Sequence, residues 1–335
     1  MDLDNIGFYT LSETRAKKSS IESPLIRAEL ILTNKCNLRC LYCRGLLPEF
    51  QQDISLSLAQ DILRIWTENK LQNIRFSGGE PALYPHLISL VQGCKNSGVK
   101  RIAISTNGTA ILNFYKELIK AGVNDFSISL DGGCCVIGDK MSGGMCGAWE
   151  KAVNSIRELS KLTYVTVGVV FNEINVSKAL ETILFIDSLH PSDIRIISSA
   201  QYDKAIKDLE KIPQNVLNKY SILKYRIKNS KIGKQMRGLD MKDYQYCPLV
   251  LDDVAVVGNY HFPCIIYLRE QGKPIGVMTE NFRQERQNWF LKHKVLEDSI
   301  CQKNCLDVCR DYNLTWRKHH KSLKNISKSS LKNFE

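Results

Sequence analysis

The residues best suited to chemistry in this sequence are its twelve cysteines, which are grouped rather than spread evenly. Three of them occur close together, at Cys36, Cys40 and Cys43, and five occur after residue 246. Clustered cysteines in a reducing compartment more often bind metals or react than form disulfides. A Cys-x3-Cys-x2-Cys loop supplies three thiolates, which can ligate three irons of a four-iron cluster and leave the fourth iron open. The spacing alone leaves open a zinc loop that lacks its fourth ligand.

Three short motifs of small and polar residues follow apolar runs further along the chain. They are Ser77-Gly78-Gly79-Glu80-Pro81, Ser105-Thr106-Asn107-Gly108 and Ser129-Leu130-Asp131-Gly132. Each motif lies at the carboxyl end of a predicted strand, where parallel α/β sheets and barrels place their ligands. Gly78 and Gly79 would let the backbone approach a ligand closely. The carboxylate of Glu80 could accept charge-assisted hydrogen bonds from an ammonium group.

The elements that must position these motifs alternate between strand and helix from residue 28 to residue 200. Apolar, β-branched runs predict strands at residues 28–32, 73–76, 101–105, 125–130, 164–171 and 193–197. Helical spacing of apolar residues predicts helices at residues 57–66, 86–94, 113–121, 149–159 and 177–189. Such repeats form parallel βα units with right-handed crossovers. The predicted fold class is therefore α/β, with a partial (β/α)6 TIM-like barrel that has too few units to close.

The cysteine loop and the three motifs together resemble the radical S-adenosylmethionine (radical SAM) superfamily over residues 28–200. The resemblance implies that Cys36, Cys40 and Cys43 hold a 4Fe–4S cluster and that S-adenosylmethionine is the cofactor. It implies an enzyme that cleaves S-adenosylmethionine to a 5′-deoxyadenosyl radical, which abstracts hydrogen from a substrate C–H bond. It also implies an electron donor of the flavodoxin or ferredoxin type as a partner.

The same resemblance implies a set of residues that bind S-adenosylmethionine. They are Tyr42, Ser77, Gly78, Gly79, Glu80, Ser105, Asn107, Ser129, Asp131, Gly168, Val169 and Ser198. Tyr42 occupies the aromatic position near the adenine, and the motif at residues 77–81 receives the methionine amino group. Ser105 and Asn107 serve the ribose hydroxyls, while Ser129 serves the methionine carboxylate. For the last three residues of the set, an ordinary place in the strand core is the alternative.

One loop departs from the pattern of the family. Where the fourth strand ends in this way, related enzymes usually carry an Arg-Gly pair before a Gly-x-x-Gly turn. Residues 139–147 read Asp-Lys-Met-Ser-Gly-Gly-Met-Cys-Gly and contain no arginine. Lys140 is the residue that could substitute, although its ammonium lacks the bidentate fork of a guanidinium.

The C-terminal cysteines form a second group, made up of Cys247, Cys264, Cys301, Cys305 and Cys309. A Gly258-Asn259 turn predicts a β-hairpin over residues 246–267, and a helical segment over residues 281–295 follows. This arrangement resembles the auxiliary-cluster domains called twitch and SPASM. The resemblance implies a small iron–sulfur domain in which four of the five cysteines bind one auxiliary 4Fe–4S cluster, and the cysteine count favours the shorter twitch form. A structural zinc site is the alternative.

The remaining four cysteines lie between these two groups. Cys134, Cys135 and Cys146 follow the fourth predicted strand, in a loop expected at the mouth of the barrel. A thiol there could return a hydrogen atom to a substrate radical, as in related epimerases, and the alternative is no chemical role. Cys94 lies on a predicted helix and is expected to be an ordinary buried thiol.

Length and composition set limits on the kind of protein. The chain has 335 residues, of which 44% are apolar and 24% charged, as in globular proteins. We predict five segments: an N-terminal extension (1–25), the barrel (26–200), a basic helical connector (201–240), the auxiliary-cluster domain (241–313) and a basic tail (314–335). No apolar run approaches the roughly 18 residues of a membrane span, and the first 25 residues hold no secretory h-region. These features predict a cytoplasmic protein without a membrane partner.

The net charge of +11 is concentrated in two stretches. Residues 201–237 hold ten lysines and arginines against three acidic residues, and residues 314–335 hold six against one. A basic surface can attract nucleic acid. The alternative is a solvated linker and tail, which the lack of regularly spaced aromatic residues favours.

These observations predict a radical SAM oxidoreductase or maturase that acts on a small polar molecule such as a sugar or an aminocyclitol. Only about 25 residues precede the first strand, too few for the leader-binding domain that peptide-modifying relatives often carry, which favours a small molecule. Modification of a peptide that is delivered in another way is the close alternative. Nucleic-acid modification through the basic segments is a further alternative. The expected reaction is oxidation, bond formation or epimerisation. Oxidation or bond formation is favoured, because cluster ligation explains more of the cysteines than hydrogen donation does. A non-enzymatic metal-binding scaffold would leave the glycine and Asn-Gly motifs unexplained.

Overall fold

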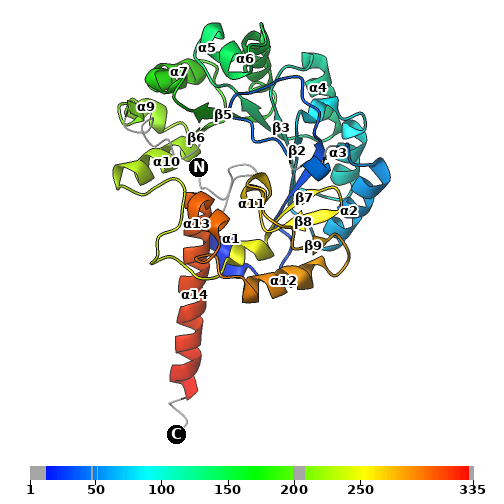
Figure 1. Ribbon diagram of the computed structural model, residues 1–335, viewed down its shortest axis with the longest axis vertical. Coiled ribbons are helices and arrows are strands. Elements are labelled where there is room, and N and C mark those ends of the chain that lie inside the picture. The colour runs from blue at the N-terminus through cyan, green and yellow to red at the C-terminus, as the bar shows by residue number, and fades with distance from the viewer. Residues whose placement is uncertain (1–12, 47, 51, 199–207, 332–335) are drawn as a thin grey trace.

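In the computed structural model, which describes residues 13–46, 48–50, 52–198 and 208–331, one nine-stranded sheet forms the centre of the protein (Figure 1). Six of its strands run parallel and are neighbours in chain order. They are β1 Arg27–Thr33, β2 Asn73–Gly78, β3 Arg101–Thr106, β4 Asp125–Ser129, β5 Tyr164–Phe171 and β6 Asp193–Ser198. All six lie where the sequence predicts strands. The α/β class with a partial, parallel barrel is therefore confirmed.

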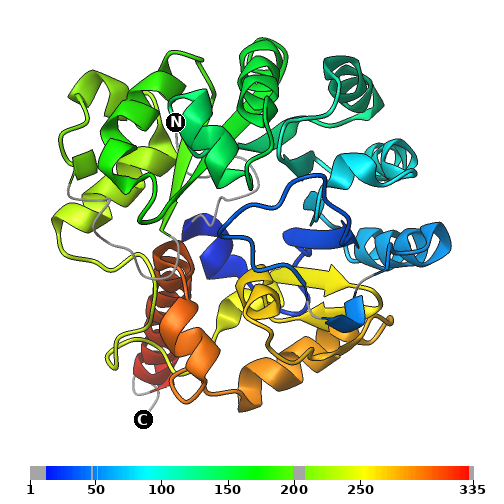
Figure 2. The same cartoon turned by 45° about the horizontal axis from the view of Figure 1, so that its top comes forward.

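Helices between these strands cover the outer face of the curved sheet, as Figures 1 and 2 show. They are α2 Leu56–Glu68, α3 Leu87–Asn96, α4 Leu112–Ala121, α6 Ala148–Leu159 and α7 Ala179–Asp187. Each coincides with a predicted helix to within a few residues. At the start of α2, the hydroxyl of Ser55 accepts a hydrogen bond from the backbone N–H of Leu58 at 3.3 Å. This cap satisfies one of the backbone donors that a helix leaves unpaired at its first turn.

Helix α5, Cys135–Met141, lies where the sequence indicates a loop. Its Gly138 packs tightly on α6, since a Cβ at this position would lie 2.2 Å from Cδ1 of Trp149. The carboxylate of Asp139 accepts hydrogen bonds from the backbone N–H groups of Gly147 and Trp149, at 2.9 and 2.8 Å. A seven-residue segment that contains glycine has little helical tendency of its own. Contacts with α6 therefore stabilise this helix, and such contacts cannot be read from the local sequence.

The two faces of the parallel sheet differ in polarity because side chains alternate along a strand. On the outer face, Leu30, Leu32 and Phe76 are buried against the helices in the main hydrophobic core. Polar side chains recur on the inner face instead, namely Glu29, Arg75, Ser77, Ser105, Ser127 and Arg195. The apolar layers that fill many barrels are thus partly replaced by charged and hydroxyl groups, which suit a polar ligand.

The C-terminal hairpin extends the barrel sheet rather than forming a sheet of its own. Its strands are β7 Asp253–Val257, β8 Tyr260–Phe262 and β9 Gly276–Val277. Strand β7 pairs parallel with β1, and the other two follow antiparallel. The guanidinium of Arg27 on β1 contacts the carboxylate of Asp253 on β7 at 2.9 and 2.7 Å, and both side chains are buried. The predicted hairpin is present, and a strand ladder and an ion pair join it to the first barrel strand.

The remaining helices gather around this hairpin and the open side of the barrel. They are α1 Glu13–Lys18, α9 Gln214–Leu217, α10 Ser221–Lys231, α11 Ile265–Arg269, α12 Phe282–Lys292, α13 Ser299–Asn304 and α14 Asp307–Leu331. Helix α14 extends away from the body of the molecule (Figure 1), so residues 314–331 of the predicted tail continue a helix. Indole Nε1 of Trp316 on α14 donates to the carbonyl of Ser19 at 3.1 Å. Among the described helices, none has the length and apolar character needed to cross a membrane.

Candidate cofactor cavity and cysteine sites

A cavity of about 660 Å³ opens at the carboxyl ends of the parallel strands. The cysteine loop after β1 contributes Cys36, Cys40 and Cys43 to its wall. Seven other residues of the predicted site also line it, namely Tyr42, Gly78, Gly79, Ser105, Asn107, Ser129 and Asp131. Because parallel strands end at the same edge of a sheet, motifs from four strands meet around one space. Its volume is typical of a site for a small organic ligand.

Four of the predicted cofactor-binding residues lie elsewhere. The hydroxyl of Ser77 is buried and donates to the carboxylate of Glu29 at 2.6 Å. Glu80 is buried behind the cavity wall, and Val169 belongs to the main hydrophobic core. Gly168 lies on β5 against Arg195, whose Nη2 would be 3.2 Å from a Cβ at this position. The side chain of Ser198 is outside the described part of the structure.

The two glycines of the motif after β2 are required by the cysteine loop. The backbone N–H of Gly79 donates to the carbonyl of Thr33 at 2.7 Å, and the next N–H donates to Lys35 at 2.8 Å. A Cβ on Gly79 would lie 2.2 Å from the carbonyl oxygen of Lys35. Gly78 has a φ of +146°, and a Cβ there would lie 2.3 Å from the carbonyl oxygen of Thr33. Only glycine allows this approach, so both residues fix the position of the cysteine loop.

Glu80 connects the motif after β2 to the motif after β3. One carboxylate oxygen accepts from the hydroxyl of Thr106 at 2.7 Å, and the other accepts from the backbone N–H of Asn107 at 2.7 Å. Burial raises the pKa of Glu80 above its usual value, although these hydrogen bonds oppose the shift. In this geometry Glu80 orients Asn107, whose amide reaches Oδ1 of Asn37 in the cysteine loop at 2.8 Å.

A second connection runs from the cysteine loop to β4 and β5. The phenol of Tyr42 donates to Oδ2 of Asp131 at 2.5 Å, and Oδ1 accepts from the backbone N–H of Val170 at 2.7 Å. Burial raises the pKa of Asp131 to about 6. The buried amide of Asn175 donates to the carbonyls of Asp131 and Val170, at 2.9 and 2.7 Å. No sequence pattern indicates Asn175, because this residue belongs to no motif and follows β5 in an irregular segment.

The segment that departs from the family pattern also holds the cysteine loop. Backbone N–H groups of Arg39 and Leu41 donate to the carbonyls of Ser142 and Met141, both at 3.1 Å. Gly143 has a φ of +89°, and a Cβ there would lie 2.4 Å from the carbonyl oxygen of Arg39. Lys140 is exposed and does not line the cavity. The suggested replacement for the missing arginine is therefore not brought to the site.

Four cations from outside the predicted site do line the cavity. They are Lys35, Arg39, Arg44 and Arg269. Arg269, on α11, donates to the carbonyls of Gly45 and Gly78, both at 3.0 Å. It therefore spans the cysteine loop and the glycine motif, although it lies far from both in the sequence. Trp149 also lines the cavity, and its Nε1 donates to the carbonyl of Gly132 at 2.7 Å.

Three thiols in one cavity wall fit the ligand set of an open-site iron–sulfur cluster. Burial is the largest cause that raises the pKa of Cys36, and it raises the pKa of Cys40 to about 12. Metal binding at these thiols would therefore release protons. The other cysteines of the barrel lie apart from this wall. Cys134, Cys135 and Cys146 are exposed and do not line the cavity, and Cys94 is buried in the core behind it.

All five C-terminal cysteines line a second, smaller cavity of about 40 Å³. They are Cys247 before the 3₁₀ turn Pro248–Leu251, Cys264 before α11, Cys301 on α13, Cys305 between α13 and α14, and Cys309 on α14. The remaining wall is mostly apolar and aromatic. Asn313 donates to Sγ of Cys247 at 3.2 Å, and the phenol of Tyr244 lies 3.2 Å from Sγ of Cys305. Burial raises the pKa of Cys264 to about 12. Converging thiols with polar neighbours fit a buried metal cluster.

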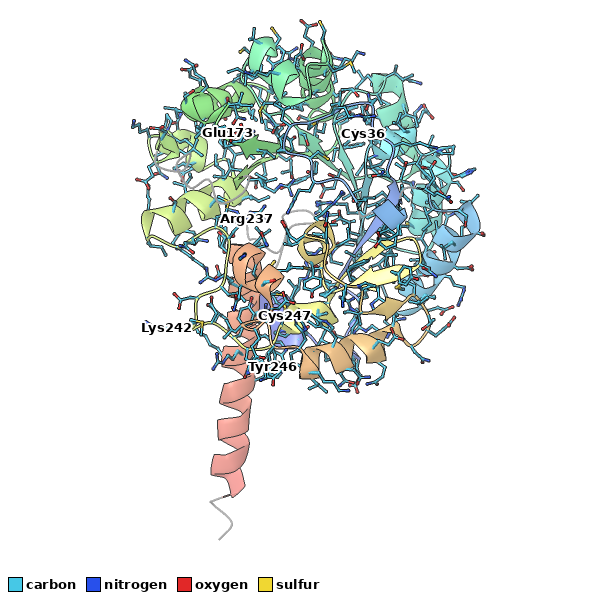
Figure 3. All side chains as sticks on the ribbon, in the orientation of Figure 1. Cys36, Glu173, Arg237, Lys242, Tyr246 and Cys247 are labelled. Carbon is cyan, nitrogen blue, oxygen red and sulfur yellow. The ribbon has the colours of Figure 1, made fainter. Side chains whose placement is uncertain are left out.

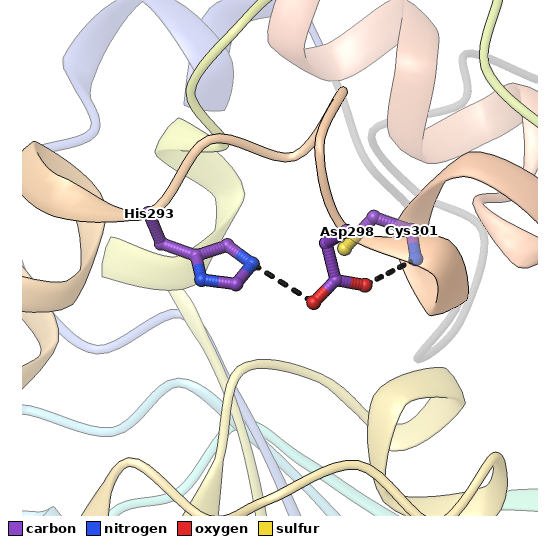
Figure 4. A group of neighbouring side chains, drawn as sticks. All are labelled: His293, Asp298 and Cys301. Carbon is purple, nitrogen blue, oxygen red and sulfur yellow. Dashed lines mark hydrogen bonds and ion pairs between the residues drawn. The ribbon is translucent and has the colours of Figure 1, made fainter.

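Cys301 differs from the other four cysteines by its neighbours. Its sulfur and the polar atoms of His293 and Asp298 lie within 4.8 Å of one another (Figure 4). The carboxylate of Asp298 accepts from the backbone N–H of Cys301 at 2.9 Å, and it lies 3.1 Å from Nε2 of His293. Asp298 also accepts from the phenol of Tyr267 at 2.8 Å. Asp298 is the N-terminal cap of α13 because it accepts from backbone N–H groups of the first turn. Capping and the contacts with His293 and Tyr267 account for this cluster of side chains without a metal ion.

A parallel partial barrel with a cysteine-lined cavity at the carboxyl ends of its strands defines an α/β protein built to hold a metal cluster beside a small ligand. The family model described as the radical SAM superfamily matches residues 30–186. Residues 30–186 therefore form a radical SAM domain, and this part of the chain belongs to that superfamily. The resemblance inferred from the sequence is thereby confirmed.

Curated relatives match about a third of the chain. A GTP 3′,8-cyclase of Alkaliphilus metalliredigens is 34% identical over 119 residues, which are 34% of this chain and 37% of that protein. The human molybdenum cofactor biosynthesis protein 1 is 34% identical over 108 residues, which are 30% of this chain and 16% of that protein. The chain thus spans little more than a third of the length of the first relative.

Solved structures match a larger share of the chain. The protein anSMEcpe with bound AdoMet superposes with a TM-score of 0.62 at 15% identity, over 91% of this chain and 99% of that chain. Streptococcus suis SuiB bound to the precursor peptide SuiA superposes with a TM-score of 0.58 at 12% identity, over 86% and 76% of the two chains. At these identities the similarity establishes the fold, including the C-terminal half.

Proposed function

We propose that this chain is a radical SAM enzyme that binds S-adenosylmethionine and a 4Fe–4S cluster in the 660 Å³ cavity, and one auxiliary 4Fe–4S cluster at the five cysteines of the C-terminal cavity. One observation carries the proposal. Three cysteines share a cavity wall with the glycine and Asn-Gly motifs, while five further cysteines converge on a separate buried cavity. A single structural zinc site would not explain why the chain has two separate groups of cysteines. It would also not explain why the first group lines a cavity large enough for a small organic ligand.

When bound, S-adenosylmethionine and its cluster supply a 5′-deoxyadenosyl radical that can take a hydrogen atom from a C–H bond. The chain supplies position and water exclusion for this chemistry. Gly78 and Gly79 hold the cysteine loop against the end of β2, and Glu80 sets the amide of Asn107. Tyr42 and Trp149 provide the aromatic surface of the wall.

The auxiliary cluster would take four of the five converging cysteines as ligands. Cys247, Cys264, Cys305 and Cys309 are the four we favour, because Cys301 is part of the capped turn with His293 and Asp298. An auxiliary cluster gives the second electron of an oxidation a route out of the substrate. Exposed positions for Cys134, Cys135 and Cys146 do not favour hydrogen donation from these thiols. We therefore favour oxidation or bond formation over epimerisation.

The substrate we favour is a small polar molecule, and the polar inner face of the barrel supports this choice. One curated relative is named as acting on GTP, and one solved structure is bound to a precursor peptide. Peptide modification therefore stays the alternative, and nucleic-acid modification is less favoured. The electron donor would be a flavodoxin or ferredoxin.

The test is anaerobic reconstitution followed by iron analysis and an assay for 5′-deoxyadenosine. We expect about eight irons per chain, about four for each cluster. The triple variant Cys36→Ala/Cys40→Ala/Cys43→Ala should keep about four irons and form no 5′-deoxyadenosine. Cys94→Ala is the control, because this thiol is buried apart from both cavities, and it should keep the full iron content. A wild-type chain that saturates with zinc and takes up no iron would disprove the proposal.

A further inference from the structure

A third cavity, of about 260 Å³, lies inside the barrel and is lined largely by arginines. The six arginines in its wall are Arg44, Arg75, Arg195, Arg226, Arg237 and Arg269. Among the described residues that line it, Glu29 is the one carboxylate. The arginines come from the cysteine loop, β2, β6, α10, α11 and the segment that directly follows α10. Six separate parts of the fold thus direct positive charge at one interior space.

This cavity lies between the two cysteine sites. It shares Arg44, Ser105 and Arg269 with the cofactor cavity. It shares Ile266 and Leu306 with the cavity of the five C-terminal cysteines. Figure 3 shows Arg237 in the region between the labelled Cys36 and Cys247. A molecule bound in the third cavity would therefore lie next to both sites at which the proposed chemistry takes place.

Part of this positive charge is balanced within the protein. Arg75 lies 4.0 Å from Glu29, Arg226 pairs with Asp307, and Arg44 pairs with Glu270. Arg269 uses two nitrogens on the backbone carbonyls of Gly45 and Gly78, at 3.0 Å each.

Arg237 is the cation with the least compensation. Its backbone is fixed by a bridge to Leu306, next to Cys305. Its Nε is buried without a hydrogen-bond partner, and no carboxylate lies within ion-pair distance of its guanidinium among the described residues. Burial and the neighbouring Arg44 and Arg226 lower the pKa of Arg237 to about 10, so it keeps its charge at neutral pH. A buried polar group without a partner costs free energy unless a ligand satisfies it.

We propose that the arginine-lined cavity binds the anionic group, a phosphate or a carboxylate, of a small-molecule substrate, with the remainder of that molecule directed past Ser105 towards the cofactor cavity. Its role as a substrate site rests on the proposed function, whereas anion binding itself does not. Guanidinium forks match the geometry of both phosphate and carboxylate groups. The volume of about 260 Å³ suits such a group with a small body.

The inner position of the arginines favours a small molecule over a peptide chain or a nucleic acid. Arg75 and Arg226 are buried, Arg195, Arg237 and Arg269 are half-buried, and Arg44 is the one exposed arginine of the six. A polymer recognised by charge would instead be expected to use exposed lysines and arginines.

The test is calorimetric titration of the reconstituted full chain with diphosphate, citrate, glucose and a hexaglutamate peptide. We expect diphosphate or citrate to bind and glucose not to bind, and the tighter of the two anions identifies the anionic group. Arg237→Gln and Arg195→Gln should each weaken that binding about tenfold, the effect of losing one charged hydrogen bond. Arg64→Gln, on the outer surface of α2, is the matched control and should bind as the wild type does. An unchanged thermal unfolding midpoint would show that each variant is folded.

Three outcomes would overturn the inference: neither anion binds, folded Arg237→Gln and Arg195→Gln bind the anions as tightly as the wild type, or hexaglutamate alone binds. Formation of 5′-deoxyadenosine is measured on the same samples, which separates the two proposals. Its formation without anion binding leaves the proposed function standing and removes this inference. Anion binding that depends on Arg237, without any 5′-deoxyadenosine, removes the proposed function and keeps the anion site.

Discussion

The residues that bind the loops of the cofactor cavity together are mostly buried acids and amides. Asp131 is the clearest example, because it connects Tyr42 of the cysteine loop to Val170 of β5. Glu80 performs the same task between the loops after β2 and β3. Each carboxylate loses hydration on folding and regains only part of it as hydrogen bonds, so each has a raised pKa.

The raised pKa of Asp131 predicts how stability depends on pH. Because the folded state holds this proton more tightly than the unfolded chain, the carboxyl destabilises the fold increasingly as pH rises from about 4 through about 6. Asp131→Asn removes this titration. From pH 5 to pH 7.5, we expect the wild type to lose on the order of 1 kcal/mol of unfolding free energy relative to Asp131→Asn. Urea unfolding of the metal-free protein at several pH values measures this difference.

The control for this titration is Asp61→Asn, at an exposed position on α2. Its difference from the wild type should change little with pH. The variant Asp131→Asn also weakens the bond to Tyr42, which adds an offset that does not depend on pH in this range. A difference between Asp131→Asn and the wild type that stays flat from pH 5 to pH 7.5 would contradict the prediction.

At the scale of elements, the pairing of β1 with β7 is what attaches the C-terminal cysteines to the barrel. The ladder runs from Arg27 opposite Asp253 to Ile31 opposite Val257. Cys264 follows two residues after the end of β8, so the position of this thiol depends on the hairpin. Buried Arg286 of α12 connects the segments on either side of the hairpin strands. Its guanidinium donates to the carbonyls of Val250, Phe262 and Pro263, at 2.7 to 3.0 Å.

Breaking the ion pair between β1 and β7 should cost stability in a way that a second substitution recovers. Arg27→Met leaves Asp253 buried without its cation, which is expected to cost about 3–5 kcal/mol of unfolding free energy. The double variant Arg27→Met/Asp253→Leu removes both charges and should recover most of this loss. Urea unfolding of the metal-free variants gives the coupling energy of the pair. Arg64→Met, which breaks two exposed ion pairs, serves as the control and should change little. If the losses of unfolding free energy in Arg27→Met and Asp253→Leu simply add in the double variant, the two charges are not coupled, and the ion pair does not join the strands.

Across the whole molecule, three cavities lie in series, from the cysteine loop through the arginines to the five C-terminal cysteines. Helix α14 closes the far end of this series. Its Tyr312 donates to Asp252 at 2.5 Å, and its Asn313 contacts both Leu249 and Cys247. These contacts all come from the first three turns of a helix of 25 residues.

Two truncations of α14 should therefore differ in iron content. A chain that ends after His320 keeps Tyr312, Asn313 and Trp316, and it should retain about eight irons after reconstitution. A chain that ends after Asp311 loses these contacts and should retain about four, those of the cysteine loop. Iron analysis with a thermal unfolding scan distinguishes loss of the auxiliary site from global unfolding. Equal iron contents for the two truncations would contradict the assignment.

The sequence by itself determined the strands, the helices between them and the three-cysteine loop. Periodicity two and periodicity 3.6 are local properties, so the six parallel strands could be read from short windows. Contiguous motifs carried the family resemblance, because the cysteines at 36, 40 and 43 and the Gly78-Gly79 pair are fixed by spacing along one loop. The same reasoning places the C-terminal hairpin at its glycine turn.

Only the tertiary structure decided which residues share a wall and which face of each strand holds charge. Arg44, Arg195 and Arg237 are far apart in the sequence, and they meet because the sheet curves and brings different strand ends to one interior space. Helix α5 and the pairing of β7 with β1 depend likewise on contacts between distant segments. Hydrogen bonds and charge act over a few ångströms in space rather than along the chain. The arginine-lined cavity therefore has no signature in any single stretch of the sequence.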